Sequence, residues 1–275
     1  LFGAKISVGA PFFNAATAPL AIPLVAAMAL GPMLAWKRAD LAGALQRLWW
    51  VGALAVASAF LTLLVAGYHV WPALGFAAAA WLIFGAAADI LDRIAAFRRP
   101  SQAWNRARGL PRAAWGGAIA HAGVGVMFAG LAGMGLATDA LVALKPGEST
   151  RLAGYEWRLE RIRDVQGPNW SARRATVTVL DGARVVTVLE PEKRFFPVGR
   201  MNTTEAAIHT NALRDLYAVL GDERDGGGVL RLHHNPLAPW IWFGAVIMAL
   251  GGGLSLSDRR VRVSAPSRKA ATAPA

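Results

Sequence analysis

Five long blocks of apolar residues constrain the fold of this chain more than any other feature. The hydrocarbon core of a bilayer is about 30 Å thick, so a helix that crosses it needs about 20 consecutive apolar residues. The blocks occupy residues 12–36, 48–67, 71–97, 113–137 and 239–256. Each block is long enough to cross a bilayer, and we therefore predict a mainly α-helical membrane protein with about five transmembrane helices.

The basic residues lie mostly in the short segments between these blocks. The chain has 29 Lys and Arg against 17 Asp and Glu, a formal net charge of +12. The excess falls within residues 37–47, 98–112 and 259–269, whereas the long polar segment is nearly balanced. Cytoplasmic loops of membrane proteins are enriched in Lys and Arg. We therefore expect these segments in the cytoplasm and the amino terminus outside, and we attribute the charge to topology, with no nucleic acid as a partner.

About 100 residues of ordinary polarity separate the fourth and fifth blocks, and they read as β-rich. Apolar and polar residues alternate along strand-like runs, and Asp181-Gly182 is a two-residue hairpin signal. The runs are residues 155–165, 175–180, 185–190, 213–220 and 229–233. Five or six short strands predict a small barrel or sandwich, similar to an OB-fold. The chain has no cysteine, so this domain must be held together by its own core.

Four regions follow from these patterns. We expect a four-helix transmembrane region at 1–137, a β-rich external domain at 138–238, a final transmembrane helix at 239–256 and a basic cytoplasmic tail at 257–275. The chain opens at Leu1 and not at a methionine, so we expect it to be a fragment of a longer polypeptide. Asp89 and Arg93 are one helical turn apart, which predicts an ion pair near the membrane interface and not a proton relay.

His121 is a polar residue in the middle of the fourth block. On a helical wheel, Gly117 and Gly125 lie on its face, one turn before and one turn after it. They would leave space beside the imidazole, of the shape that a flat macrocycle needs. A different face carries Gly116, Gly123 and Gly130, which would let another helix approach closely. From the residues alone, His121 is either a packing residue that hydrogen-bonds a neighbouring helix or a ligand of haem or a metal.

Several stretches, in order along nearly the whole chain, resemble one known family. They are KISVGAPFFN (5–14), WGGAIAHAGVGVMFAG (115–130), EKRFFPVGRMNTTEAAI (192–208), RDLYAVLG (214–221) and NPLAPWIWFGAVIMALGGGLSLSDRR (235–260). They look like the carboxy-terminal half of the CcmF family, the haem-lyase subunits of bacterial cytochrome c maturation, and of its NrfE-like relatives. In that family, a transmembrane histidine pair holds a b-type haem, and the resemblance implies that His121 is one axial ligand, with Gly117 and Gly125 facing the haem.

The resemblance also implies a function and a location. The chain would be a haem-binding subunit that takes part in haem delivery and covalent ligation to apocytochrome c, in the bacterial inner membrane with its β domain in the periplasm. The implied partners are apocytochrome c, the subunits that present it, a haem carrier protein and the upstream half of the same protein. The second axial ligand and the tryptophan-rich haem-handling segment are expected upstream of Leu1, so no catalytic residue is assigned in this chain.

The other histidines carry weaker signals. His233 and His234 are adjacent on an expected strand, where successive side chains point to opposite faces, so they are not expected to share one ion. His209 is predicted to be a solvated loop residue. The sequence shows no H-E-x-x-H motif and no nucleophile beside a base, so nothing points to hydrolysis. An alternative function is a non-catalytic membrane scaffold or transport-type subunit whose polar domain docks a partner, with His121 as a packing residue.

Overall fold

The computed structural model describes residues 10–34, 40–224 and 226–258. The chain divides into two compact units. The first comprises Leu1–Leu61, Phe76–Phe128 and Phe243–Ala275, and the second comprises Thr62–Gly75 and Ala129–Trp242. The expected tail from residue 259 onward lies outside the described residues.

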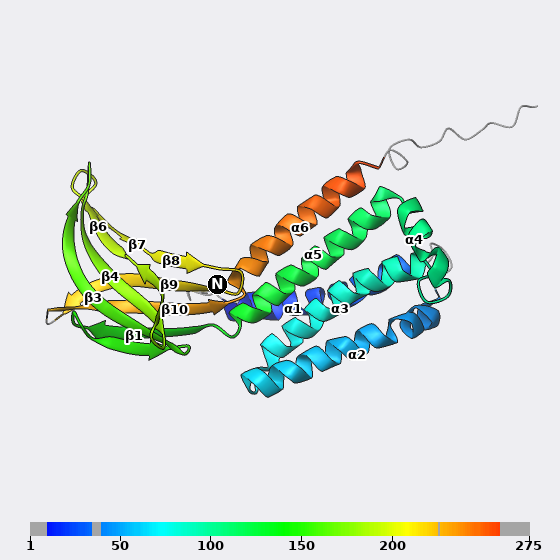
Figure 1. The fold of residues 1–275 in the computed structure, drawn as a ribbon, viewed down its shortest axis with the longest axis horizontal. Coiled ribbons are helices and arrows are strands. Elements are labelled where there is room, and N and C mark those ends of the chain that lie inside the picture. Colours follow the sequence, from blue (N-terminus) through cyan, green and yellow to red (C-terminus); the bar gives the residue numbers. More distant parts are fainter. Residues whose placement is uncertain (1–9, 35–39, 225, 259–275) are drawn as a thin grey trace, which may run out of the picture. The chain divides into compact units, whose positions relative to one another are not determined.

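Most helical residues lie in the first unit, although some helix ends belong to the second, and Figure 1 shows the helices as coiled ribbons from blue to green and in orange. The helices are α1 (Ala10–Leu30), η1 (Gly31–Met33), α2 (Leu41–Ala66), α3 (Val70–Arg93), α4 (Pro100–Gly109), α5 (Arg112–Met134) and α6 (Ala238–Leu256). Four of them, α2, α3, α5 and α6, are long and apolar enough to cross a membrane. The expected multi-pass membrane fold is therefore confirmed.

The first expected span, residues 12–36, differs from the other four. Helix α1 contains Pro19 and Pro23, and its end passes into the 3-10 turn η1, where Pro32 occupies one of the first positions. Pro19 and Pro23 each lack the N–H that would donate to the carbonyl oxygen four residues earlier in the helix. Its apolar helical stretch, Pro19–Met33, is shorter than 18 residues, so four of the five expected spans are long enough among the described residues.

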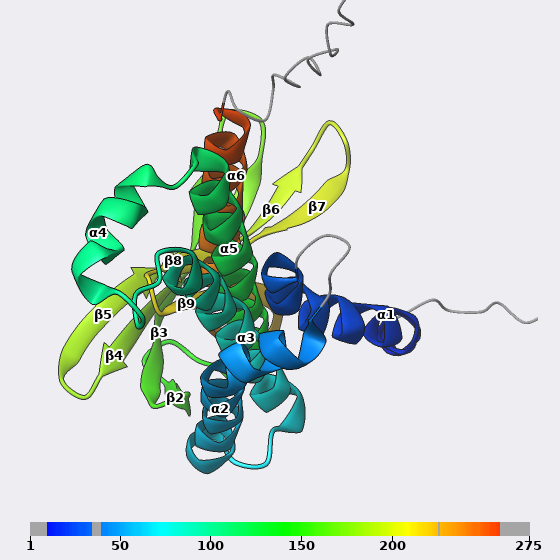
Figure 2. The same cartoon turned by 90° about the vertical axis from the view of Figure 1, so that its right-hand side faces the viewer.

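A short helix, α4, lies within the basic segment that joins α3 to α5, where the sequence predicted only a loop (Figure 2). Pro100 stands in its first turn, a position where the missing N–H costs nothing. The guanidinium of Arg108 lies 4.8 Å from the centre of the Trp104 ring, a cation–π contact one turn apart. The helix is polar, so the apolar periodicity used to predict helices could not reveal it.

Glycines set the approach of α6 to α5, as the sequence predicted for Gly116 and Gly123. A Cβ atom at Gly123 would lie 2.7 Å from the backbone nitrogen of Met248, and one at Gly244 would lie 2.6 Å from the Gly123 carbonyl oxygen. Gly116 and Gly251 face each other in the same way one heptad along. Side chains at these positions would force the two backbones apart.

The second unit contains a β-sandwich. Its strands are β1 (Thr138–Leu144), β2 (Ser149–Leu152), β3 (Tyr155–Gln166), β4 (Ser171–Asp181), β5 (Arg184–Leu189), β6 (Glu192–Phe196), β7 (Met201–Glu205), β8 (Ala207–Thr210), β9 (Arg214–Arg224) and β10 (Gly227–Pro236). One antiparallel sheet has the order β1-β10-β9-β8; the other has the order β2-β3-β4-β6-β7, with β5 also paired to β4. Of the two expected architectures, barrel or sandwich, the sandwich is observed.

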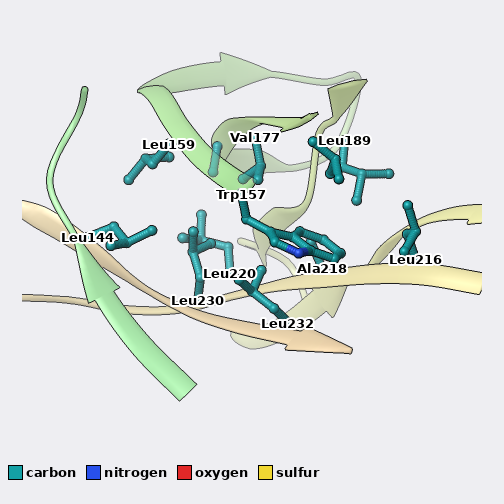
Figure 3. Close-up of a cluster of buried hydrophobic side chains, with 12 residues drawn as sticks. Leu144, Trp157, Leu159, Val177, Leu189, Leu216, Ala218, Leu220, Leu230 and Leu232 are labelled. Carbon is teal, nitrogen blue, oxygen red and sulfur yellow. The ribbon is translucent and has the colours of Figure 1, made fainter. Parts of the chain in front are cut away.

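The core of the sandwich lies between its two sheets (Figure 3). Leucine, valine and alanine side chains from β3, β4 and β5 face those from β9 and β10, and most of them are fully buried. Trp157 on β3 lies at the centre, fully buried, and its indole N–H donates to the carbonyl oxygen of Leu152 at 3.3 Å. Burial of large apolar side chains is the main stabilising contribution to such a domain.

The predicted hairpin at Asp181-Gly182 is confirmed, because β4 and β5 pair antiparallel across this turn and Gly182 has a φ of +58°. The expected number of strands was too low. The part of the chain that the structure describes contains ten strands, and those missed are mainly short, among them the β6–β7 hairpin shown in Figure 2.

Candidate functional site

His121 lies midway along α5, and a hydrogen bond to its own helix fixes its ring. The Nδ1 atom is 2.7 Å from the carbonyl oxygen of Gly117, one turn earlier. A carbonyl oxygen can only accept, so Nδ1 carries the proton and donates it. In the neutral imidazole, Nε2 then holds the free lone pair, which is the form that binds a metal ion. The backbone of Gly117 thus selects the tautomer of His121.

A small cavity lies beside His121 inside the first unit. Its volume is about 110 Å³, and residues of α1, η1, α3 and α5 form its wall. They are Met28, Pro32, Leu82, Gly85, Ala86, Asp89, Arg93, Ala113, Ala114, Gly117, Ala118 and His121. A Cβ atom added at Gly117 would meet no atom within 4 Å, so this glycine opens the wall next to the imidazole.

Gly125 does not leave space in the same way. A Cβ atom there would lie 2.6 Å from Cγ1 of Ile83 and 3.0 Å from the carbonyl oxygen of Ala79, both on α3. The open notch expected at Gly125 is therefore filled by a neighbouring helix, and only the Gly117 side is open. The helical wheel placed both glycines on the face of His121 correctly, but it contains no information about which helix packs there.

The predicted ion pair between Asp89 and Arg93 is confirmed. The Nε atom of Arg93 donates to both carboxylate oxygens of Asp89, at 2.9 and 3.0 Å, and Asp89 is 7% exposed. The pair also lines the cavity beside His121, which the sequence analysis missed. A signal was present, because Gly85, Asp89 and Arg93 repeat every four residues and so share one face of the third apolar block.

The residues that line the cavity beside His121 can supply one metal ligand, His121 itself, and not a complete coordination shell. Among the described residues, no group of three or more His, Cys, Asp or Glu side chains is placed to hold a metal ion. A metal ion that a macrocycle already holds needs only axial ligands from the protein. His121, with its oriented ring and a free Nε2, fits that requirement, and the small residues beside it fit the edge of a flat group.

Within residues 138–224 and 226–236, the histidines of the sandwich belong to no group of three or more possible metal ligands. His233 and His234 lie on β10 against different partners: the His233 ring is 5.3 Å from that of Tyr217, and the His234 ring is 6.1 Å from that of Tyr155. The prediction that the two side chains would not share an ion is consistent with this placement. Burial lowers the pKa of His234, and the nearby positive charge of Arg214 lowers it further.

The prediction for His209 was wrong. This residue lies within β8 and pairs with Leu216 of β9, so it is part of a sheet and not of a solvated loop. Strand β8 has only four residues, which is too short for a period-two alternation to be recognised.

Comparison with known proteins identifies relatives of both the sandwich and the whole chain. The family described as "CcmF C-terminal beta-sandwich" matches residues 135–236. The chain is 44% identical to the cytochrome c-type biogenesis protein ccl1 of Rhodobacter capsulatus, a match that covers 98% of this chain and 41% of the relative. It is 43% identical to the cytochrome c-type biogenesis protein CycK of Rhizobium meliloti, over 98% of this chain and 40% of that protein.

A solved structure has the same fold. The structure titled "Cytochrome c Heme Lyase CcmF" superposes with a TM-score of 0.69 at 24% identity, covering 90% of this chain and 41% of that one. The chain thus spans about two fifths of the length of the relatives that it matches. It belongs to the CcmF family of cytochrome c-type biogenesis proteins and corresponds to their carboxy-terminal part.

Proposed function

We propose that this chain takes part in haem handling during cytochrome c maturation and that His121 is an axial ligand of a b-type haem. The observation that carries the proposal is the hydrogen bond from His121 Nδ1 to the Gly117 carbonyl oxygen, which leaves Nε2 free. Histidines that bind metals nearly always donate their other ring N–H in this way, because the bond orients the ring and makes Nε2 more basic. The relatives are named as cytochrome c-type biogenesis proteins, and we take the pathway from these names.

Each residue of the proposed site has a separate task. A bound haem would supply an iron that exchanges single electrons. His121 would hold that iron through Nε2, and Gly117 would both orient the ring and leave room for the haem edge. Gly125 would act indirectly, by letting α3 approach α5 closely behind the site. We assign no catalytic residue in this chain.

The proposed site needs groups from outside this chain. The cavity of about 110 Å³ is well below the roughly 300–1,000 Å³ of ligand pockets. The relatives are more than twice as long as the region that matches. We place the second axial ligand, together with the residues that join haem to the apocytochrome thiols, in the additional part of such a full-length protein.

We infer the orientation of the chain in the membrane from its basic segments, and its partners from its family. The basic segments at residues 37–47 and 98–112 favour a cytoplasmic location, in the inner membrane of a bacterium. The β-sandwich would then lie in the periplasm, where cytochromes c are assembled. Its partners there would be apocytochrome c, the subunits that present it and a haem carrier protein.

The test is the absorption spectrum of the full-length protein with and without His121. We expect His121→Ala to lose the sharp bands of low-spin b-type haem and most of the bound haem. His69→Ala is the matched control, because His69 is exposed in the turn between α2 and α3 and should leave the spectrum unchanged. His121→Gly with added imidazole should recover the low-spin bands, since free imidazole can enter the vacated position.

Two results would overturn the assignment. One is a low-spin b-type spectrum of full intensity in His121→Ala. The other is loss of haem in His121→Gly that imidazole does not reverse while the variant keeps its helical circular dichroism and its elution volume, because this would indicate that the ring acts in packing.

A further inference from the structure

A second, larger cavity lies in the first unit, where the charged end of α3 meets the start of α2. Its volume is about 720 Å³. We call it the α2–α3 groove, and its lining residues are Met33, Gln46, Arg47, Trp49, Trp50, Ala88, Leu91, Asp92, Phe97 and Arg98. Nothing in the proposed haem function uses these residues.

One carboxylate holds two arginines together at the mouth of this groove. Asp92 accepts a hydrogen bond from Nη1 of Arg47 at 3.3 Å and another from Nη2 of Arg98 at 2.7 Å. Two guanidinium groups would repel each other without the carboxylate between them. Asp92 therefore holds the two guanidinium groups in place. The three side chains together carry one net positive charge.

The backbone at the end of α3 brings Arg98 back to Asp92. Ala95 has a φ of +52°, and the N–H of Ala96 donates to the carbonyl oxygen of Leu91 at 3.0 Å. This is the pattern of a helix that ends in a left-handed residue, which reverses the chain direction. A non-glycine residue adopts such a φ at a cost of about 1 kcal/mol, which the contacts of this turn must offset.

Both arginines keep N–H groups for a further anion. Arg47 donates from Nη1 to Asp92 and from Nε to the carbonyl oxygen of Gly43, at 3.1 Å, so its Nη2 donates to no partner among the described residues. Arg98 uses only Nη2 within the same part of the chain. The side chains of Arg47 and Arg98 are 40% and 71% exposed, so an incoming anion can reach them.

The rest of the groove is apolar and aromatic. Trp49 and Phe97 are 70% and 79% exposed at its rim, although both are large apolar residues. Met33, Trp50 and Ala88 belong to a packed cluster that forms the floor. Exposed aromatic rings at the end of a transmembrane helix are typical of the membrane interface, so acyl chains are the natural occupants of this surface.

We propose that the α2–α3 groove binds one anionic phospholipid. The phosphodiester, with one negative charge, lies on Arg47 and Arg98, and an acyl chain lies along Trp49, Trp50 and Phe97. The net charge of +1 at the mouth matches one phosphate and disfavours the added cation of a zwitterionic headgroup. Basic pockets between transmembrane helices are known to take acidic lipid headgroups. A soluble phosphate would leave the apolar wall uncovered.

The experiment is native mass spectrometry of the full-length protein in detergent, with phosphatidylglycerol or phosphatidylcholine added. We expect one retained phosphatidylglycerol, held about tenfold more tightly than phosphatidylcholine. The double variant Arg47→Gln, Arg98→Gln should retain both lipids equally. Arg106→Gln is the matched control, because Arg106 is exposed on α4 outside the groove and its loss changes only the overall charge.

Two further measurements test the proposal if the glutamine double variant does not fold. The headgroup comparison on the unaltered protein needs no variant, and Arg47→Lys with Arg98→Lys should keep part of the preference because the charges remain. Equal retention of the two lipids by the unaltered protein would overturn the proposal. So would displacement of the lipid by a large excess of inorganic phosphate, or undiminished phosphatidylglycerol binding in a folded glutamine double variant.

Discussion

Gly117 serves His121 in two ways that no other residue type could combine. Its carbonyl oxygen accepts the Nδ1 proton of His121, and its missing side chain leaves the cavity beside the ring open. Any residue could supply the carbonyl, but only glycine also supplies the space. The two contributions can be separated by substitution, because a larger side chain at position 117 keeps the backbone acceptor.

Gly117→Leu should therefore reduce haem content without unfolding the helices. The leucine would enter the cavity of about 110 Å³, where a Cβ atom meets nothing within 4 Å, so the helix itself can accept it. Crowding of a bound group typically costs about 1–3 kcal/mol, which corresponds to roughly 5- to 150-fold weaker haem retention. Haem per polypeptide in the full-length protein measures the effect. Gly252→Leu on α6, also in open space, is the control, and equal haem content in the two variants would contradict the prediction.

Glu192 on β6 makes the sandwich sensitive to acid. Burial raises the pKa of Glu192, but hydrogen bonds from Arg194, at 2.7 Å, and from Arg174 outweigh it and hold the pKa below its usual value. The folded-state pKa is thus below the unfolded-state value of about 4.3. The stabilisation is complete above that value and is lost as the pH falls through the folded-state pKa.

Glu192→Gln should lower the free energy of unfolding at neutral pH by about 3 kcal/mol, because two arginines lose their buried partner. It should also flatten the decline in stability below about pH 4. Urea unfolding of the sandwich across this pH range provides the measurement. Glu160→Gln is the control, since Glu160 is exposed on β3 of the same sheet. An unchanged acid dependence in Glu192→Gln would show that other carboxylates cause it.

The candidate site was only partly predictable from the sequence. His121 stood out because a polar residue in an apolar block is costly in lipid, and Gly117 followed from helical periodicity. The closure of the space at Gly125 by Ile83 depends on which helix packs against α5, and the periodicity of one helix contains no such information. For the same reason, the sequence did not predict that Asp89 lines the cavity beside His121. The two residues come close only when α3 and α5 pack together.

The close packing of α5 on α6 rests on glycines of both helices. In lipid, helices gain little from burying apolar side chains against each other, so close backbone contact supplies much of their attraction. Gly123 lies against the backbone of Met248, and Gly244 lies against the backbone of Met127. The contact leaves no room for a side chain on either helix.

Gly123→Leu should separate these helices. Its side chain would meet backbone atoms of Met248 and Gly244 within 3 Å, and backbone cannot move aside as a flexible side chain can. We expect a loss of about 1–3 kcal/mol or more in stability, measured by titration with sodium dodecyl sulfate and circular dichroism. Gly253→Leu, on α6 with no atom near its Cβ position, should cost much less. Equal losses in the two variants would mean that the glycines do not determine this interface.

Elements were predictable where one chemical pattern dominates them. The long apolar blocks identified α2, α3, α5 and α6, and the alternation of apolar and polar residues identified β3. By contrast, β6, β7 and β8 are short and show no regular apolar alternation, so their pairing with neighbours, and not their own pattern, makes them strands. The polar helix α4 was missed for a related reason, since its stability depends on local contacts such as that of Arg108 with Trp104.

The sandwich has its own hydrophobic core and its own hydrogen-bonded sheets, as an independently folding domain requires. All its core residues lie between Leu144 and Leu232, within the second unit, and its strands pair only with one another. Among the described residues, the buried side chains of this core come from both sheets and include no helix residue. We therefore predict that a fragment of residues 138–236 folds in water without the membrane helices.

We expect urea to unfold that fragment in one cooperative transition. Near-ultraviolet circular dichroism of its tryptophans monitors the unfolding. Trp157→Ala should cost about 3–5 kcal/mol, because it removes the fully buried side chain at the centre of the core and leaves a cavity. Val188→Ala, at a side chain that is 51% exposed on β5, should change stability by no more than about 0.5 kcal/mol. A fragment that unfolds without a cooperative transition, or that tolerates Trp157→Ala as well as Val188→Ala, would show that the sandwich needs the helices to form its core. Cooperative unfolding would mean that the domain can present its surface to partners whatever the state of the proposed haem site.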